Sequence, residues 1–391
     1  MSEADGGERR ARVALSFLAD PGDQVLGAAL RTMTAAEVLA ATTGTDGFGD
    51  AMLAPSVPEP AMSRAMRRWR TRLSLVPSVA RLAAWQDSGL RLVCPGDAEW
   101  PTQLDDLGDA RPLVLWLRGT VDLRFACVSS VSVVGARAAT GYGMHVGLQM
   151  AAGLAERGLT VISGGAFGID ASAHRGALAA DGVTAAVLAG GVSYGYPRGH
   201  ADLFAAIAAQ GLVVSECPPD QAPTRPGFLI RNRLIAALGR GTVVVEAALR
   251  SGALNTARHA RELCRPVMAV PGPVTSEQSA GCHELIREYG AMCVTTARDV
   301  LEHLEPAASA DSSAGQPAAG PRRGPAMERD HLDPVSRAVL EQVPVRRGRG
   351  PASIAIRAGV DLDTAMRTLG LLGAAGFVQR CDHGWQLRRT E

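Results

Sequence analysis

Short glycine-bearing segments recur in the middle of this sequence, and their composition suits the binding of an anion. Two of them are GARAATGYG at residues 135–143 and SGGAFGID at residues 163–170. Glycine has no Cβ atom, so the backbone can approach an anion closely, and Arg137 can contact two phosphate oxygens at once. Neither segment has the dinucleotide pattern GxGxxG or the P-loop pattern. Neither dinucleotide binding nor nucleoside triphosphate hydrolysis is therefore indicated.

Two further segments carry the remaining candidates for a phosphate site. The first is FLIRNRLIAALGRG at residues 228–241, and no acidic residue neutralises its arginines between Thr224 and Arg240. Arg231 and Arg233 diverge by roughly 200° on a helix. We therefore expect one to face a carboxylate inside the protein and the other to face the bound phosphate.

The second of these segments, EAALRSGALNTA at residues 246–257, passes from an expected strand into an expected helix. Ser251, Asn255 and the free N–H groups of the helix N-terminus could receive an anion there. A glycine turn between a strand and a helix is common for reasons of geometry alone. Four such segments at one sheet edge are a more specific pattern.

Strand-like runs alternate with helical stretches from about Cys127 onward. The runs are VSSVSVV, LTVIS, VTAAVLA, LVVSE, GTVVVEA and RPVMAVPG. They are almost continuously apolar, as is typical of parallel strands that helices cover on both faces. The sequence thus predicts an α/β, Rossmann-like, doubly wound and mostly parallel sheet over residues 119–305. Loops at the carboxyl ends of its strands would gather the four candidate segments.

The flanking regions have different patterns. Residues 1–118 have helical apolar spacing and are expected to form a helical, SAM-like domain with a connector; Asp20–Asp23 is interpreted as a plain turn between helices. Residues 306–331 are rich in Ala, Pro, Ser and Gly and are expected to be a flexible linker. Residues 332–391 predict three helices and a hairpin, which together indicate a winged helix.

Composition limits the function classes. The net charge of +1 excludes a generally basic nucleic-acid coat, so a polyanion site must come from locally concentrated arginines. Seven cysteines without C-x-x-C spacing indicate reduced thiols in the cytoplasm and argue against a tetrahedral zinc site. The sequence shows no signal peptide and no apolar run long enough to span a membrane. We expect no cofactor, no metal and no membrane partner.

Several motifs in fixed order resemble the DNA-processing protein A family, also called DprA or Smf, from about Trp100 to Leu304. They are VVGARAATGYG, ISGGAFGIDASAHRGAL, AAVLAGGVSYGYP, VVSECPP, FLIRNRLIAALGRGTVVVEAALRSGALNTARHA and VPGPVTSEQSAGCHELIREYGA. The resemblance implies a protein that is not an enzyme. It implies that the protein binds and protects single-stranded DNA, forms a homodimer and loads the RecA recombinase during DNA uptake and recombination.

The motif match implies that DNA is held by Arg137, by the run 231–233, by Gly164, Gly165 and Gly168, and by Ser251 and Gly252. Charge, aromatic rings and position in the loops add the other residues. The expected DNA-binding set is Gly135, Arg137, Gly164, Gly165, Phe167, Gly168, Phe228, Arg231, Asn232, Arg233, Arg240, Arg250, Ser251, Gly252 and Asn255. The sequence departs from the family at Phe167, where a basic residue is common, and at Ile230, where a proline is common before R-N-R. Phe167 removes a positive charge from the loop but supplies an aromatic ring.

Aromatic side chains in these loops carry information because only 4% of the residues are aromatic. Phe167, Tyr194, Tyr196 and Phe228 all fall near expected strand ends. Single-stranded sites combine positive grooves with aromatic faces on which bases stack. Each ring is either a stacking platform or ordinary packing beneath a loop, and Phe228 is the strongest candidate for stacking.

Two alternative functions, a metal-dependent nuclease and a phosphoribohydrolase, are suggested by carboxylates and by one glycine loop. Asp170, Glu216 and Glu246 could hold the metal of a nuclease; the alternative is that Asp170 caps a helix and the two glutamates pair with buried arginines. Residues 239–246, GRGTVVVE, resemble the loop of Rossmann-like nucleoside monophosphate phosphoribohydrolases, with one extra residue before the glutamate. We also expect a structural hydrogen bond for His174.

The sequence gives two candidate partners for the C-terminal domain at residues 332–391, which are duplex DNA and another protein. The candidate contacts of this domain are Arg346, Arg347, Arg349, Arg357, Arg367 and Arg380. Asp361 and Asp363, at the start of the expected recognition helix, would oppose phosphate contact there.

Overall fold

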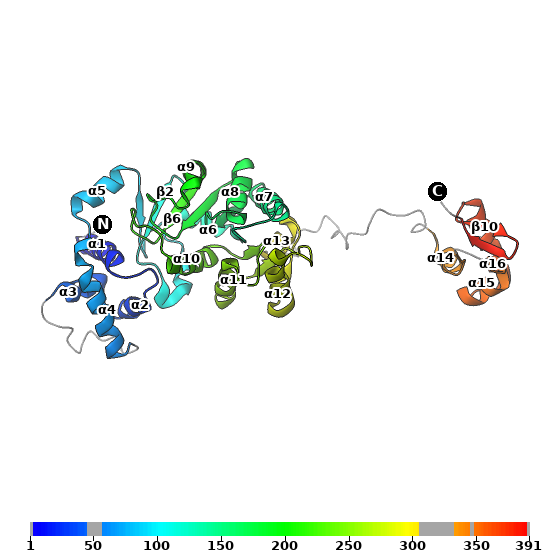
Figure 1. Cartoon of the computed structure of the whole chain (residues 1–391), viewed down its shortest axis with the longest axis horizontal. Helices are drawn as coiled ribbons and strands as arrows, with labels where there is room; N and C mark the ends of the chain where they lie inside the picture. Colours follow the sequence, from blue (N-terminus) through cyan, green and yellow to red (C-terminus); the bar gives the residue numbers. More distant parts are fainter. Residues whose placement is uncertain (1–2, 45–56, 305–331, 345–347, 389–391) are drawn as a thin grey trace. The chain divides into compact units, whose positions relative to one another are not determined.

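The computed structural model describes residues 3–44, 57–304, 332–344 and 348–388. The chain forms two compact units, Met1–Ala310 and Asp311–Glu391 (Figure 1). The linker expected at residues 306–331 lies outside the described residues. None of the described helices is long and apolar enough to cross a membrane.

A nine-stranded sheet forms the centre of the first unit, with the order β1-β2-β6-β5-β4-β3-β7-β8-β9. Its strands are β1 (Arg91–Val93), β2 (Leu115–Gly119), β3 (Ser130–Val134), β4 (Thr160–Ser163), β5 (Thr184–Leu188), β6 (Leu212–Ser215), β7 (Thr242–Val244), β8 (Val267–Ala269) and β9 (Met292–Cys293). The seven strands from β6 to β9 in this order are mutually parallel. This confirms the predicted fold class, and all six predicted strand runs are present.

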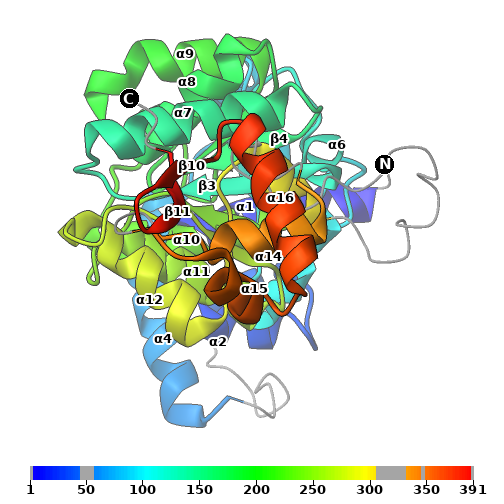
Figure 2. The same cartoon turned by 90° about the vertical axis from the view of Figure 1, so that its right-hand side faces the viewer.

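Helices cover both faces of the sheet, as the continuously apolar strands require. They are α6 (Leu123–Val128), α7 (Gly141–Ala155), α8 (Ile169–Ala179), α9 (Ala201–Gln210), α10 (Arg225–Leu238), α11 (Gly252–Glu262), α12 (Ala280–Tyr289) and α13 (Ala297–Leu304). Figures 1 and 2 show α7, α8 and α9 on one face and α10, α11 and α12 on the other. Alternate strand residues fill the two cores: Val134 and Val244 pack toward α10 and α11, and Val133 and Val243 pack toward α7 and α8.

The strand order reverses between β3 and β7. The chain moves outward from β3 to β4, β5 and β6, and then returns to place β7 on the other side of β3. In open α/β sheets, ligands bind outside the carboxyl ends of the strands at such a switch point. The loops after β3 and after β7, which contain two of the predicted segments, therefore border the expected crevice.

The N-terminal region is mainly helical. Its elements are α1 (Glu3–Leu18), α2 (Gln24–Ala29), α3 (Ala35–Thr43), α4 (Glu59–Thr71), η2 (Leu73–Leu75), α5 (Val79–Asp87) and η3 (Thr102–Ala110). Leu15, Leu18 and Trp69 are fully buried in its own small core. The turn before α2 ends in Asp23, whose carboxylate accepts the N–H groups of Val25 and Leu26, so the turn caps a helix.

Two strands of the sheet lie within the region expected to be helical, residues 1–118. β1 and β2 pair antiparallel with each other, and β2 pairs antiparallel with β6. β1 has three residues and β2 has five. The sheet therefore begins before the expected boundary.

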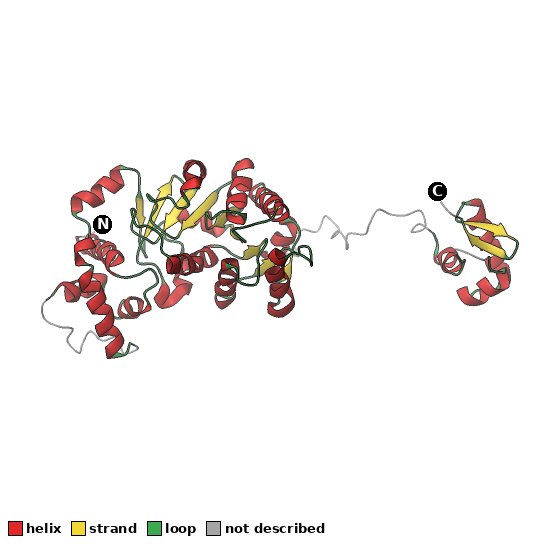
Figure 3. Cartoon of the chain, viewed as in Figure 1, coloured by secondary structure: helices red, strands yellow, loops and turns green. Residues whose placement is uncertain are grey.

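The described part of the second unit consists of three helices and a two-stranded antiparallel sheet (Figure 3). The elements are α14 (Pro334–Glu341), α15 (Pro351–Ala358), α16 (Leu362–Ala374), β10 (Val378–Cys381) and β11 (Gly384–Leu387). Val339, Ile354 and Leu369 are fully buried in its core. Asp361 begins α16 by accepting the N–H of Thr364.

Candidate nucleic-acid interface

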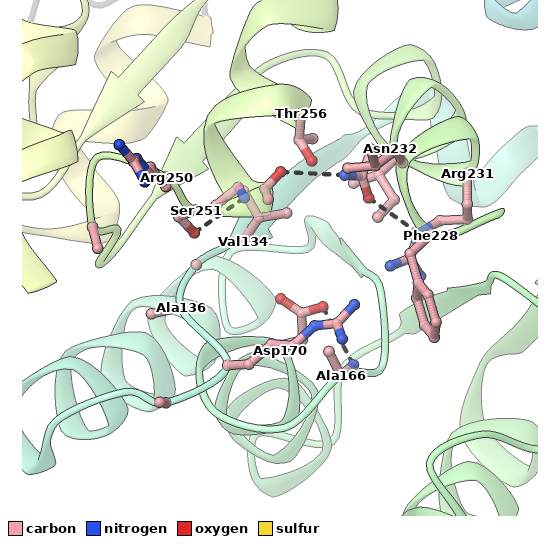
Figure 4. Close-up of a pocket in the computed structure, with 18 of the residues that line it drawn as sticks. Val134, Ala136, Ala166, Asp170, Phe228, Arg231, Asn232, Arg250, Ser251 and Thr256 are labelled. Carbon is pink, nitrogen blue, oxygen red and sulfur yellow. Dashed lines mark hydrogen bonds between the residues drawn. The ribbon is translucent and has the colours of Figure 1, made fainter. Parts of the chain in front are cut away.

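A pocket of about 380 Å³ opens at the switch point between β3 and β7. It is lined by the loop after β3, by α10, by the loop after β7 and by the first turn of α11. Figure 4 shows Phe228 and Arg231 on one side of this pocket and Arg250 and Ser251 on the other. Eight residues of the predicted DNA-binding set line it: Gly135, Arg137, Phe228, Arg231, Asn232, Arg250, Ser251 and Gly252.

Arg137 is the most accessible cation of the loop after β3. Its side chain is exposed, and its guanidinium carbon lies 4.5 Å from the centre of the Phe228 ring. A guanidinium over an aromatic face is attracted by the negative charge of that face. Phe228, which is half-buried on α10, therefore holds Arg137 at the pocket.

Arg231 forms the buried wall of the pocket. Its Nη1 donates to the carbonyl oxygen of Gly164 at 2.7 Å and also to that of Val187, and its Nε donates to Asn232 Oδ1 at 3.3 Å. Burial lowers the pKa of Arg231 to about 10, and the nearby Asp170 carboxylate opposes this shift. The guanidinium is therefore still charged at neutral pH, and it links the carboxyl ends of β4 and β5 to α10.

Asp170 is the one carboxylate that lines the pocket. Burial raises its pKa, while Arg231 and the N–H of Ala166 lower it. The carboxylate accepts that N–H at 3.3 Å, as Figure 4 shows. Gly168 is the N-cap of α8 and no side chain caps that helix, so the prediction that Asp170 caps a helix is wrong. Asp170 stabilises the loop before the helix instead.

The first turn of α11 faces the pocket with its N-terminus. Ser251 is the N-cap residue and accepts the N–H of Ala253. The Asn232 amide donates to the carbonyl oxygen of Gly252 at 3.2 Å, and the Asn255 amide donates to the carbonyl oxygen of Leu229 at 3.2 Å. Asn232 and Asn255 thus join α10 to α11, and Asn255 itself lies behind the pocket wall. The positive end of the helix dipole adds to the charge of Arg250 at this edge.

Arg233 points away from the pocket, as expected for one member of the arginine pair. Its Nη2 donates to both carboxylate oxygens of Glu216, at 2.9 and 2.7 Å, and its Nε donates to the carbonyl oxygen of Ala110 at 3.0 Å. Glu216 also accepts the N–H of Gly22 at 3.1 Å. The buried pair joins α10 to the N-terminal helical region.

Three predicted glycines are required by contacts within the protein rather than by an anion. A Cβ atom on Gly164 would lie 2.6 Å from Arg231 Nη2, and one on Gly135 would lie 2.5 Å from a side-chain carbon of Ile169. Gly168 has φ +77°, and its Cβ would lie 2.2 Å from the carbonyl oxygen of Ala136. Gly252 is different, because its Cβ would meet nothing within 4 Å. Only Gly252 leaves its backbone open toward the pocket.

Two other members of the predicted set lie next to the pocket without lining it. Gly165 has φ +68° and packs against Phe204, and its carbonyl oxygen lies 3.1 Å from His200 Nδ1. Phe167 is 52% exposed, and its ring packs edge-on against His200 with centroids 4.5 Å apart.

Arg240 lies elsewhere. It precedes β7 at the amino end of the strand, whereas the pocket is at the carboxyl end, and its Nη2 donates to the carbonyl oxygen of Leu304 at 2.6 Å. The sequence predicts Arg240 and Arg231 in one site because no acidic residue lies between them in the chain. The length of α10 places them at opposite edges of the sheet.

The pocket is also lined by Gln278, Leu229 and Thr256, which are not in the predicted DNA-binding set. Gln278 comes from η5 (Glu277–Ser279), which follows β8. The VPGPVTSEQS run in the family motif was the available signal for Gln278. Leu229 and Thr256 had the same kind of signal, because both lie in the motif that begins with FLIRNR.

The carboxylates that suggested a metal site are engaged separately. Glu216 pairs with Arg233, which confirms one expected pairing. Glu246 accepts the N–H and the hydroxyl of Thr140, each at 2.8 Å, so its expected pairing with an arginine is wrong. Within the described residues, no group of three His, Cys, Asp or Glu side chains could hold a metal ion.

The structure also shows where the glycine loop of the phosphoribohydrolase alternative and His174 lie. Gly239–Thr242 lies at the start of β7 and Glu246 lies beyond its end, so these residues do not form one phosphate loop as in a phosphoribohydrolase. His174 is fully buried, and its Nδ1 lies 2.7 Å from the hydroxyl of Thr184. That contact confirms the structural hydrogen bond expected for His174.

The fold and the pocket define a Rossmann-like protein with a cationic site at the topological switch point. Residues 91–305 match the sequence model of the DNA recombination-mediator protein A family, and the match begins at the first residue of β1. The chain belongs to this family.

Named relatives agree with this assignment. A DprA protein of Mycobacterium tuberculosis is 45% identical over 316 residues, which cover 77% of this chain and 78% of the relative. Protein Smf of Escherichia coli is 42% identical over 230 residues, which cover 58% of this chain and 60% of the relative. The X-ray structure of DNA processing protein A from Streptococcus pneumoniae is 31% identical with a TM-score of 0.59, and the match covers 75% of this chain and 96% of that one.

Proposed function

We propose that this chain binds single-stranded DNA at the switch-point pocket and acts by binding rather than by catalysis. The observation that carries this proposal is the convergence of Arg137, Arg231 and Arg250 with the N-terminus of α11 on one pocket of about 380 Å³. These groups suit phosphate oxygens. The pocket is far too small for a duplex, but it can take a phosphate and its neighbouring atoms from a single strand.

Arg137 and Arg250 are the proposed phosphate ligands. Both are exposed at the mouth of the pocket, and neither has an ion-pair partner among the described residues. Arg231 contributes positive charge from the wall, but its Nη1 already donates to two backbone carbonyls. Binding a phosphate at the mouth therefore leaves the buried scaffold unchanged.

The test is equilibrium binding of a fluorescent thymidine oligonucleotide, single-stranded or annealed, across a salt series. Arg137→Ala and Arg250→Ala should each weaken single-strand binding and reduce the salt slope by roughly 0.7, the value for one phosphate contact of a single strand. Arg240→Ala is the matched control because it removes the same charge at the opposite edge. Wild-type affinity in Arg137→Ala at low salt would refute the site.

We also propose that the bound strand is protected and passed to the RecA recombinase by a dimer of this chain. Support comes from the family to which the chain belongs, whose description is DNA recombination mediator. The checks are light scattering for the dimer, nuclease digestion for protection, and RecA-dependent strand exchange on DNA coated with single-strand-binding protein. No stimulation of exchange by the wild-type chain would contradict the loading role alone.

The second unit is proposed to be a winged helix that contacts duplex DNA or protein. Arg367 on α16 and Arg380 on β10 are exposed, but Asp361 and Asp363 lie at the N-terminus of α16. The same salt series with a chain truncated after Leu304 separates any contribution of this unit to DNA binding.

A further inference from the structure

The turn that follows β5 places aromatic and basic side chains beside the pocket. Tyr196 on this turn is 45% exposed, and its ring centre lies 5.7 Å from that of Phe228. Phe228 in turn contacts Arg137 at the pocket. The exposed surface of Tyr196 is thus separated from the proposed phosphate ligand by one ring.

Phe167 lies against the other end of the same turn. Its ring packs on His200, and a Cβ atom on Gly199 would lie 3.6 Å from Phe167 Cζ. His200 is buried and its Nδ1 lies 3.1 Å from the carbonyl oxygen of Gly165, so the base of the Phe167 ring is fixed. About half of the Phe167 side chain nevertheless stays in solvent.

Arg198 adds a positive charge to this turn, two residues after Tyr196. It is exposed, it lies 5.9 Å from the centre of the Tyr194 ring, and no carboxylate pairs with it among the described residues. Sites for single strands combine exposed cations for the backbone with aromatic faces for the bases. Tyr196 and Arg198 on the turn after β5, together with Phe167 from the loop after β4, supply both, and these three residues are here called the aromatic shelf.

Phe228 is poorly suited to be the stacking platform, although the sequence favoured it. The guanidinium of Arg137 lies against its ring and the Tyr196 ring lies near it, so little of its surface is left for a base. Tyr194 is also covered in part, by Arg198. The exposed rings are those of Tyr196 and Phe167.

We propose that the aromatic shelf is a second subsite, on which bases of the single strand stack after the backbone leaves the phosphate pocket. This proposal rests on the proposed function, because the pocket supplies the first contact. Stacking accepts every base, since each base has an aromatic face. The shelf therefore adds affinity for bases without selecting a sequence.

The experiment compares a thymidine oligonucleotide with an abasic sugar-phosphate strand of equal length and charge. Wild-type protein should bind the thymidine strand more tightly. Tyr196→Ala and Phe167→Ala should each weaken thymidine binding roughly tenfold, the scale of one lost stacking contact, and leave abasic binding unchanged. Tyr196→Phe should restore the affinity. Phe125→Ala is the matched control, because Phe125 is 76% exposed on α6, which precedes the amino end of β3.

The outcomes separate the shelf from the pocket. The shelf is contradicted if both alanine variants bind the thymidine strand as tightly as wild type. It is also contradicted if they lose equal affinity for the thymidine and the abasic strand. Neither result contradicts the phosphate pocket. If wild type binds neither strand, the proposed function itself fails.

Photocrosslinking tests the shelf in the wild-type chain, so it does not depend on the folding of a variant. A strand with 5-iododeoxyuridine at successive positions is irradiated in the complex, and the crosslinked peptide is identified by mass spectrometry. Crosslinks to Tyr196 or Phe167 support the shelf. Crosslinks confined to other residues contradict it.

Discussion

Arg233 Nη2 lies 2.7 Å from Glu216 Oε2, and both side chains are almost completely buried between α10 and the N-terminal helical region. The same arginine donates to the carbonyl oxygen of Ala110, and the same glutamate accepts the N–H of Gly22. Arg231, two residues earlier, is joined instead to the carboxyl ends of β4 and β5. The R-N-R motif therefore fixes α10 to two regions of the fold at once.

Removing one partner of the buried pair should destabilise the protein. Glu216→Gln leaves the Arg233 charge buried without its counter-charge, and the expected loss is about 3 kcal/mol of unfolding free energy. Urea denaturation of the chain truncated after Leu304 measures this loss. Arg81→Ala is the control, because its ion pair with Asp220 is exposed and worth roughly 1 kcal/mol or less. Equal losses in both variants would contradict the structural role of the pair.

Phe228 is expected to act on DNA through Arg137. Phe228→Leu keeps an apolar side chain but removes the ring beneath the guanidinium, so the affinity for a thymidine strand should fall roughly two- to fivefold. The salt slope should stay at its wild-type value because Arg137 still reaches a phosphate. Arg137→Ala should reduce that slope, so the two variants differ in a measurable way. A slope in Phe228→Leu that matches Arg137→Ala would mean that the arginine no longer contacts the strand.

Two glycines at the site should respond oppositely to alanine. Gly164→Ala places a Cβ atom 2.6 Å from Arg231 Nη2, so the buried guanidinium must shift and the melting temperature should fall. Gly252→Ala meets nothing within 4 Å and should leave the melting temperature unchanged or slightly raised. The methyl group of Gly252→Ala nevertheless stands where a phosphate would approach α11, so it should weaken DNA binding. Undiminished binding would place the phosphate away from α11.

The sequence predicted most of the fold because the central strands lie in almost continuously apolar stretches that must be buried. It also predicted the main elements of the pocket, since Arg137 lies in the loop after β3 and the loop after β7 leads into α11. Arg240 shows what could not be predicted, because local charge does not reveal at which end of a helix a side chain will reach the sheet edge. The role of Gly164 could not be predicted either, since its neighbour Arg231 is distant in sequence.

The aromatic residues show a similar limit. Sequence position placed Phe167, Tyr196 and Phe228 near strand ends but gave no measure of their exposure. In the structure, Phe228 is half-buried against Arg137, while Phe167 and Tyr196 keep 52% and 45% of their surface in solvent. Which ring is free depends on packing between α10 and the turn after β5, two segments that the sequence does not show to be neighbours.

His174 should make the stability of the first unit depend on pH. Burial lowers the pKa of His174 to about 3, below its ordinary value of 6.5, so the folded protein keeps the ring neutral. The unfolded chain binds a proton as the pH falls below about 6.5, while the folded chain does not. Stability from the neutral ring is therefore fully present above that pH and is lost as the pH falls toward about 3. The expected loss between about pH 7 and about pH 5 is about 2 kcal/mol.

His174→Asn isolates this contribution because the amide does not titrate. The variant can still offer a polar group to Thr184, whose hydroxyl also donates to the carbonyl oxygen of Val161. Urea unfolding of wild type and variant at both pH values measures the difference between their pH dependences, in which the contributions of Asp170 and the other titrating groups cancel. The variant should lose about 2 kcal/mol less than wild type on acidification. Parallel pH profiles would show that the folded protein accepts a proton at His174, which would contradict the burial of this ring between α8 and β5.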